Sequence, residues 1–324
     1  MRDRVQRLCS GTLDAKELRE RALIELRRTV PFDAHVWTLT DPVTRVGTSP
    51  LADIPGLSWP ELPALVRARY LSEGTRWTDL TGTCTATWRH TAEVLTAVFA
   101  DRFGCWAWLD LWRTSGPPFT SGERDLIAAV VPALTAALRK AQARTFATAP
   151  STAPPAAPAV LVLGADLQVR VGTPAARDAL HRLNPPDDPA VVEQAIPAAA
   201  YNLAAALVAA ENGVPVGPPW SRVHLGAGRW VTLRAARTAP DDGIAVTIEE
   251  ATPAERLEIF ALAHGLTPRE REVLAELVTG TDSRHLARRL VLSEHTVNDH
   301  IKAILAKTGA PTRPTLLARV AGTG

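Results

Sequence analysis

Residues 266–320 read LTPREREVLAELVTGTDSRHLARRLVLSEHTVNDHIKAILAKTGAPTRPTLLARV, a stretch that contains the start and stop signals of four short helices. The first helix has Thr267 as its N-cap, Pro268 at its first position, and Glu270 placed to bond back to the cap. Gly280 can end this helix because glycine adopts the left-handed conformation at little cost. The pattern therefore predicts one capped helix that ends just before this glycine.

The next two helices are separated by a very short turn. Asp282 can cap one of them, and Ser293 can cap the other, which is expected to run to Lys307. Only residues 291–293 lie between them, and so tight a connection forces the helices to cross steeply, as in a helix-turn-helix unit. The apolar positions expected to form the core of this unit are Val273, Leu277, Leu286, Ala287, Val297, Ile301 and Leu305.

The helix that begins after Ser293 has a polar face opposite its apolar one. Asn can bond adenine at two points, Asp can accept from the cytosine amine, and Lys can reach guanine O6 and N7. Side chains near the helix N-terminus are placed for phosphates, because free backbone N–H groups and the helix dipole favour an anion there. The candidate DNA-contacting residues, which include two of the chain's four lysines, are Ser293, His295, Thr296, Asn298, Asp299, Lys302 and Lys307.

This stretch resembles the DNA-binding domain of LuxR-type (NarL/GerE-like) bacterial transcription regulators. The positions that fit the family's pattern are Leu266, Thr267, Arg269, Glu270, Glu272, Val273, Leu274, Gly280, Leu286, Ala287, Leu290, Ser293, Thr296, Val297, His300, Leu305 and Gly309. The resemblance covers roughly one-sixth of the chain. It implies that Asn298, Asp299 and Lys302 face base edges, whereas His295 and Thr296 face the DNA backbone.

The same resemblance implies double-stranded DNA and a second copy of the chain as partners, with RNA polymerase as a further candidate. Many members of the family have Lys or Arg in place of Asn298, and the adjacent Asp299 adds a negative charge. A different sequence preference is therefore expected. A small helical bundle used for packing or protein contact is the alternative interpretation, and the helix-turn-helix spacing favours DNA binding over it.

Length and composition limit the class of protein. At ~150 residues per domain, 324 residues predict two or three domains, and 46% hydrophobic residues are enough for buried cores. The three cysteines lack C-x-x-C spacing and the N-terminal pattern is charged, so we expect a cytoplasmic protein without a signal peptide. The longest apolar run, residues 126–138, is shorter than the ~20 residues that span a bilayer, so no membrane segment is expected.

The sequence lacks the common catalytic motifs. It has no phosphate-binding loop, no nucleophile elbow and no H-E-x-x-H zinc motif. His285, His295 and His300 are close in sequence, but the last two are off the i, i+4 spacing that a metal would need. We therefore expect no enzyme activity, no metal and no cofactor.

Residues 1–145 are predicted to form one mixed α/β domain. The helices expected in it are residues 13–30, 61–72 and 124–143, and the strands are residues 34–40, 45–48 and 105–113. Its last part, PFTSGERDLIAAVVPALTAALR, contains a capping box from Thr120 to Glu123 that opens the final helix. The order of elements and this turn resemble GAF sensor domains.

Seven of the nine tryptophans lie in this domain. Trp106, Trp108 and Trp112 have the same parity on the predicted strand and are expected to share one face. Trp37, Trp106 and Trp108 are the candidate lining of a pocket for a small apolar or planar ligand. The alternative is ordinary core packing, since tryptophan mostly buries area and bonds its N–H locally.

Residues 146–158 are rich in Ala and Pro and are expected to form an extended linker. Residues 159–250 resemble a PAS domain. The strands expected there are residues 160–163, 167–171, 222–225, 230–235 and 244–249, and the helices are residues 173–183 and 191–210. A linking helix is predicted within residues 251–265, where Thr252 and Glu255 form a capping box, and residues 266–324 complete the DNA-binding domain.

The sequence thus predicts α/β sensor domains with antiparallel sheets and helices, followed by an all-α four-helix domain with a helix-turn-helix. The expected function is sequence-specific DNA binding controlled by the sensor half, with a small-molecule effector as a candidate ligand. Two alternatives stay open. The chain could be a ligand-independent dimeric regulator, or a protein-interaction module with a degenerate sensor.

Overall fold

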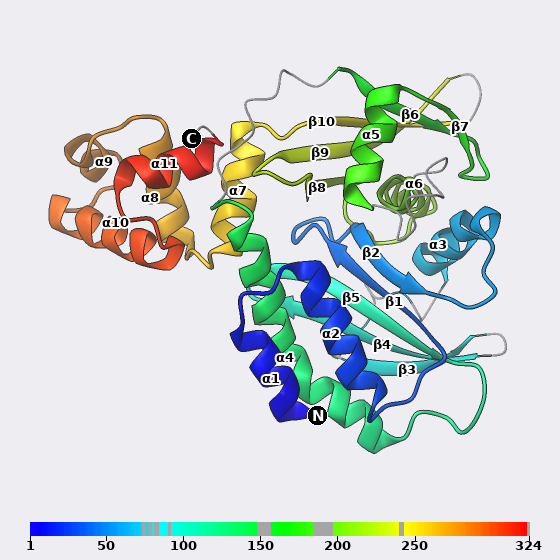
Figure 1. Cartoon of the computed structure of the whole chain (residues 1–324). Coiled ribbons are helices and arrows are strands. Elements are labelled where there is room, and N and C mark those ends of the chain that lie inside the picture. Colours follow the sequence, from blue (N-terminus) through cyan, green and yellow to red (C-terminus); the bar gives the residue numbers. More distant parts are fainter. Residues whose placement is uncertain are drawn as a thin grey trace.

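The computed structural model describes residues 1–72, 76, 80, 84–89, 92–147, 157–184, 197–239 and 243–322. These residues form two five-stranded antiparallel sheets with helices packed on them, followed by a group of C-terminal helices (Figure 1). The first sheet has the order β2-β1-β5-β4-β3 and the second has the order β7-β6-β10-β9-β8. The two sheets therefore have the same topology when the strands are counted within each unit.

The first unit holds the N-terminal sheet. Its strands are β1 (Ala34–Thr40), β2 (Gly47–Asp53), β3 (Cys84–Arg89), β4 (Ala92–Asp101) and β5 (Gly104–Arg113). Its helices are α1 (Arg2–Ser10), α2 (Ala15–Arg27), the 3-10 helix η1 (Trp59–Glu61), α3 (Leu62–Leu71) and α4 (Ser121–Arg144). The three helices and three strands predicted for this unit are present, whereas α1, β3 and β4 were not predicted.

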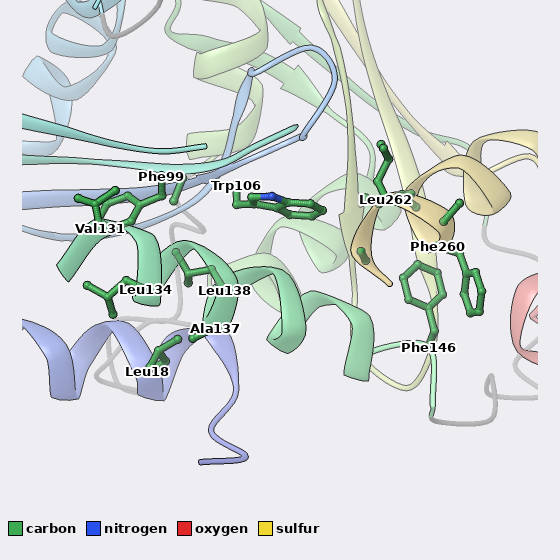
Figure 2. Close-up of a cluster of buried hydrophobic side chains, with 14 of the residues drawn as sticks. Leu18, Phe99, Trp106, Val131, Leu134, Ala137, Leu138, Phe146, Phe260 and Leu262 are labelled. Carbon is green, nitrogen blue, oxygen red and sulfur yellow. The ribbon is translucent and has the colours of Figure 1, made fainter. Parts of the chain in front are cut away.

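Helix α4 forms the core of the first unit. The predicted capping box is confirmed, since Thr120 accepts from the Glu123 N–H and Glu123 accepts from the Thr120 N–H. By length and composition alone this helix could cross a membrane, but its apolar side chains pack on the sheet and on α1 and α2, as Figure 2 shows around Leu134 and Leu138. The helix is therefore explained as the core helix of this unit.

The expectation that Trp106 and Trp108 share a face is wrong. In the ladder between β4 and β5, Phe99 pairs with Ala107 but Ala100 pairs with Cys105, so the strand has one extra residue at Trp106. Such a β-bulge reverses the alternation of side chains. Trp106 consequently lies in the core beneath α4, while Trp108 belongs to the core on the opposite face.

The second unit repeats the arrangement with shorter elements. Its strands are β6 (Ala159–Leu163), β7 (Val169–Gly172), β8 (Trp220–His224), β9 (Trp230–Arg237) and β10 (Ile244–Glu250), and its helices are α5 (Pro174–Leu183) and α6 (Ala198–Glu211). The predicted elements are present, although the start expected for the second helix, residues 191–196, lies outside the described residues. All alanines of α6 except Ala210 are buried, and their small size lets this helix pack between α3 and β2 of the first unit and β9 of the second.

The C-terminal part is helical throughout the described residues. Its helices are α7 (Pro253–Ala263), α8 (Pro268–Val278), α9 (Ser283–Arg289), α10 (Glu294–Thr308) and α11 (Arg313–Ala321). In Figure 1, α7 lies beside the second sheet and the end of α4, and α8 to α11 extend away from both sheets. The capping box predicted for α7 at Thr252 and Glu255 is confirmed.

The first residue of the expected linker, Phe146, is part of the core. Phe146 is 1% exposed and stacks on Trp230 of β9 at 4.9 Å between ring centroids. Its ring also meets Phe260 of α7 edge-on at 5.2 Å. The chain therefore leaves α4 through a packed aromatic contact, and most of the remaining linker, residues 148–156, lies outside the described residues.

Candidate DNA-binding site

Helix α8 begins with the predicted capping box, which also anchors another helix. Thr267 donates its N–H to Glu270 at 2.7 Å and accepts from the Glu270 N–H at 3.3 Å. Lys307, near the end of α10, donates to both carboxylate oxygens of Glu270 at 2.8 and 2.7 Å. Burial disfavours the charge of Glu270, but the bonds from Lys307 and Thr267 outweigh this and hold its pKa below the usual value.

Lys307 is therefore tied to the body of its own domain. The sequence placed it among the DNA-contacting residues, and that role stays a prediction. On a helical wheel it lies on the side of α10 that faces α8, away from the centre of the exposed face. In this structure Lys307 joins the end of α10 to the start of α8.

The turn between α9 and α10 has an unusual backbone. Asp282 caps α9 by accepting from the His285 N–H at 2.8 Å, as predicted. Val291 in the turn has a φ of +53° and is 89% exposed. This left-handed region is strained for a β-branched residue, so the sharp turn is kept at a local cost.

Helix α10 is held by its apolar side and leaves its polar side free. Ser293 caps it by accepting from the Thr296 N–H at 3.0 Å, and Gly309 ends it with a φ of +61°. Of the residues predicted for the core of the domain, Val273, Leu277, Leu286, Ala287 and Val297 are buried, and Ile301 and Leu305 are partly buried against them. Leu316 and Val320, which were not among the predicted core residues, are also fully buried.

The predicted reading residues lie on the exposed side of α10. The side chains of His295, Asp299 and Lys302 are 85%, 53% and 76% exposed, and Asn298 is exposed beside them. Positions 295, 299 and 302 follow the i, i+4, i+7 spacing that places residues on one helical stripe. Ser293 is also exposed and Thr296 half-buried at the start of the helix. The structure thus brings the predicted residues together on one helix.

Asp299 is at the centre of this stripe. Its Oδ2 lies 3.3 Å from Nε2 of His295, and its Oδ1 accepts from the Lys302 ammonium at 3.5 Å. Both neighbours are nitrogen groups on the same exposed face. The negative charge of Asp299 is thus partly balanced where it would meet DNA.

Arg256 of α7 fastens the C-terminal helices to the rest of the chain. Its guanidinium donates to the carbonyl of Val320 at 2.9 Å and to that of Arg319 at 3.1 Å, at the end of α11. It also donates to the carbonyl of Gly228 at 2.8 Å, in the hairpin between β8 and β9. A cation is favourable at a helix C-terminus, where carbonyls lack partners. One side chain therefore connects α11, α7 and the second sheet, and local sequence patterns gave no sign of it.

Arg222 of β8 joins the two sheets to α7. It donates through Nε and the backbone N–H to Asp41, at 2.8 and 3.0 Å. Another of its nitrogens donates to the carbonyl of Glu255 at 3.2 Å and to the carboxylate of Glu258 at 2.6 Å. Asp41 lies in the turn after β1, so Arg222 links the first unit to α7.

The same junction contains two partly buried histidines, His224 and His264. His264 follows α7 and packs on Phe260 at 4.2 Å between ring centroids, and its Nδ1 lies 2.9 Å from the Phe260 carbonyl. Burial lowers the pKa of His264 to about 4, and burial with the nearby Arg256 charge lowers the pKa of His224 to about 4. Both histidines are therefore neutral at physiological pH.

Within the described residues, Trp37, Trp106 and Trp108 do not line a common pocket, because Trp108 lies in a different core from the other two. Trp37 is fully buried and stacks on Phe99 at 5.0 Å between ring centroids, and Trp106 donates to Asp101 at 3.1 Å. A cavity between α1 and α4 has a volume of about 10 Å³, enough for one water at most, and none of the three tryptophans lines it. The indoles serve as core, in line with the alternative interpretation.

Helices α8 to α11 form a helix-turn-helix domain, with α9 and α10 as its two crossing helices. Residues 264–320 match the family described as bacterial regulatory proteins, luxR family. The C-terminal domain is therefore a luxR-family helix-turn-helix domain.

Comparisons over the whole chain are more remote. Two solved structures of SdiA, one in complex with octanoyl-rac-glycerol and one of the Escherichia coli protein, are similar at 12% and 14% identity. Each has a TM-score of 0.36 over 100% of this chain, covering 94% and 96% of those chains. No curated protein matches the sequence. The resemblances of residues 1–145 to GAF domains and of residues 159–250 to PAS domains stay predictions.

Proposed function

We propose that this chain is a sequence-specific DNA-binding transcription regulator that inserts α10 into the major groove. The exposed stripe of His295, Asp299 and Lys302 on the second helix of a luxR-family helix-turn-helix carries the proposal. The major groove admits one α-helix, and helix-turn-helix domains place this second helix in it. Asn298, Asp299 and Lys302 then face base edges, and His295 lies at the end of the stripe nearest the DNA backbone.

The start of α10 contacts the DNA backbone in this proposal. Ser293, His295 and Thr296 lie in its first turn, where backbone N–H groups without helical partners and the helix dipole attract phosphates. Contacts of this kind fix the register of the protein on the duplex and carry little sequence information.

In this proposal helices α8 to α11 are the reading domain, and the N-terminal half controls the position of this domain rather than covering it. The stripe on α10 is exposed in the full chain, so the sheets do not block it. They hold α7 through Arg222 and hold α11 through Arg256 on α7. A change in the first unit that moves Asp41 would reach the reading domain along this path and alter how two copies meet a two-fold DNA site. The proposed partners are a second copy of the chain, RNA polymerase and a small-molecule effector, in the cytoplasm.

The test is DNA selection from a genomic pool with the full-length protein, followed by fluorescence anisotropy on the selected and scrambled sequences. Lys302→Ala should weaken binding to the selected site by about 1–3 kcal/mol and relax the preference at one base pair. Lys140→Ala, which changes a lysine of α4 in the first unit, is the charge-matched control. It should leave the affinity for the selected site and the base preference unchanged. If the wild-type protein selects no sequence, the proposal is wrong.

A ligand-independent regulator is the second candidate, favoured by the close packing of Trp37 and Trp106 in the core. In that case the first two units would only position and dimerise the reading domain. Thermal unfolding with fractions of a metabolite extract separates the two candidates. A fraction that raises the midpoint supports an effector, because a ligand stabilises the state that it binds. No shift with any fraction supports the ligand-independent regulator.

A further inference from the structure

Asp299 and Lys302 form an acceptor and a donor that lie side by side on the exposed face of α10. The distance from Asp299 Oδ1 to Lys302 Nζ is 3.5 Å. Both side chains are more than half exposed, so the pair has little stabilising effect on the fold and can adjust to a partner at small cost. Because folding stability does not explain this surface ion pair, we consider what the two groups could bind together.

The edge of a C·G base pair in the major groove carries the complementary pair of groups. Cytosine N4 is a donor, and guanine O6, to which N4 is hydrogen-bonded within the base pair, is an acceptor. Two atoms in such a bond are about 2.9 Å apart, close to the separation of the Asp299 and Lys302 groups. A carboxylate above N4 and an ammonium above O6 would therefore each meet a partner without separating from one another.

We propose that Asp299 and Lys302 read one C·G base pair as a unit, Asp299 accepting from cytosine N4 and Lys302 donating to guanine O6 and N7. This inference rests on the proposed function and adds the identity of one base pair in the binding site. Reading by a unit differs from reading by separate residues, because loss of either member affects the same base pair.

The charges around Asp299 explain how an acid can stand on a surface that approaches DNA. His295 lies on the other side of the carboxylate, at 3.3 Å from Oδ2. Lys302 supplies a full positive charge at Oδ1. The carboxylate thus approaches the duplex between nitrogen groups, which reduces its repulsion from phosphates. A lone carboxylate would be repelled without this balance.

An A·T pair also places a donor, adenine N6, beside an acceptor, thymine O4. Next to O4, however, it presents the C5-methyl group of thymine, whereas guanine presents the second acceptor N7. An ammonium group gains one partner on guanine and none on the methyl group. The pair formed by Asp299 and Lys302 therefore favours C·G over A·T.

The experiment selects binding sites from random DNA with full-length wild type, Asp299→Ala, Lys302→Ala and the double variant. The expected result is one strongly preferred C·G pair for the wild type, with the preference there reduced about 10-fold in each single variant. The double variant should reduce the preference for this base pair no further than the more strongly affected single variant does, because the two residues act together. Glu294→Gln is the control, since Glu294 is an exposed acid in the first turn of the same helix; it should leave the preferred base unchanged.

Chemical replacement of the base gives a second measurement. 7-Deazaguanine removes N7 alone, so it should weaken wild-type binding about 2- to 10-fold and leave Lys302→Ala unaffected. Asp299→Ala should bind scrambled DNA more tightly than wild type, since one negative charge is removed, while binding the selected site less tightly.

Four outcomes would overturn the inference and leave the proposed function intact. The single variants could relax two different base pairs, or the shared pair could be other than C·G. Asp299→Ala could tighten binding to all sequences with an unchanged motif, which would make Asp299 only a repelling group. Wild type and Lys302→Ala could respond equally to 7-deazaguanine. If the wild type selects no motif at all, the proposed function itself fails.

Discussion

Asp41 and Arg222 form an ion pair in which neither side chain is exposed, although 181 positions separate them in the sequence. Arg222 donates to both carboxylate oxygens of Asp41, and the N–H of Val43 donates to the same carboxylate at 2.9 Å. Burying two charges is costly, so such a pair stabilises a structure only when its hydrogen bonds are satisfied. Its evident effect here is to fix the turn after β1 against β8 in one arrangement.

Breaking this pair on one side should destabilise the protein. Arg222→Met leaves a buried carboxylate without its partner, so we expect a loss of about 3–5 kcal/mol in the free energy of unfolding by urea at pH 7. The double variant Asp41→Leu with Arg222→Met should be more stable than Arg222→Met alone, because no isolated charge remains. Glu258→Gln, which removes a half-exposed partner of Arg222, is the control and should cost less than about 1 kcal/mol. Additive losses in the double variant would contradict this account.

The sequence indicated local structure well and long-range contacts poorly. The capping boxes at Thr120, Thr252 and Thr267 were all recognised, because a cap and its partner are three residues apart and the hydrogen bonds follow from that spacing. The bonds from Arg222 to Asp41 and from Arg256 to the end of α11 depend on how separate elements meet. No local pattern contains that information.

The tryptophans show a second limit of sequence reasoning. Parity along a strand places side chains on one face only while the ladder is regular. The bulge at Trp106 adds one residue to β5 and reverses the face, and neither Trp106 nor its neighbours mark that position by composition. The exposed polar face of α10 was predicted correctly because such a face depends on spacing within one regular helix, which α10 keeps from Glu294 to Thr308.

Arg256 should set the orientation of the reading domain relative to the sheets. Arg256→Gln removes the hydrogen bonds to the carbonyls of Val320 and Gly228. It should therefore widen the distribution of distances between one spin label on α10 and one on β10, measured by double electron–electron resonance. Because the stripe on α10 is already exposed, binding to a single half-site should change less than about twofold. Binding to the complete two-fold site should change more, since its two half-sites demand a fixed geometry.

Arg182→Gln, at an exposed arginine of α5, is the matched control and should leave the distance distribution unchanged. An unaltered distribution in Arg256→Gln would show that α7 and α11 hold together without this side chain. In that case the path from the sheets to the reading domain would run through apolar packing.

Acid should destabilise the junction around α7. The folded state lowers the pKa of His264 and of His224 from 6.5 to about 4, so between these values the unfolded chain binds more protons than the folded one. Stability is therefore complete above about pH 6.5 and falls as the pH drops toward 4, by about 1–3 kcal/mol per histidine. His264→Phe keeps an aromatic ring beside Phe260 and should flatten this dependence in urea titrations from pH 7.5 to 4.5. Both histidines are neutral at pH 7.5, so the difference in stability between variant and wild type at this pH measures any change in packing. If the unfolding free energy of His264→Phe fell with decreasing pH as steeply as that of wild type, His264 would not be a source of the pH dependence.

The strained turn residue gives a prediction of the opposite sign. Val291 has a φ of +53° between α9 and α10, a conformation that costs a non-glycine residue on the order of 1–3 kcal/mol. Its side chain is 89% exposed, so removing it loses little buried area. Glycine relieves the strain, but it gives the unfolded chain more conformational freedom, which lowers the free energy of unfolding by about 0.5–1 kcal/mol. Val291→Gly should therefore raise the unfolding free energy by about 1 kcal/mol, measured by thermal or urea unfolding of the full chain.

Val171→Gly is the matched control, because Val171 is also an exposed valine, at 66%, but lies in the extended strand β7. Glycine relieves no strain there and weakens the strand, so this variant should be less stable than wild type by about 0.5–1 kcal/mol. Opposite signs for the two substitutions would show that the backbone of the turn, and not the loss of an exposed valine, decides the effect. A destabilised Val291→Gly would mean instead that the stiffness of valine helps to hold the angle between α9 and α10, in which case binding to the selected DNA should weaken in the same variant.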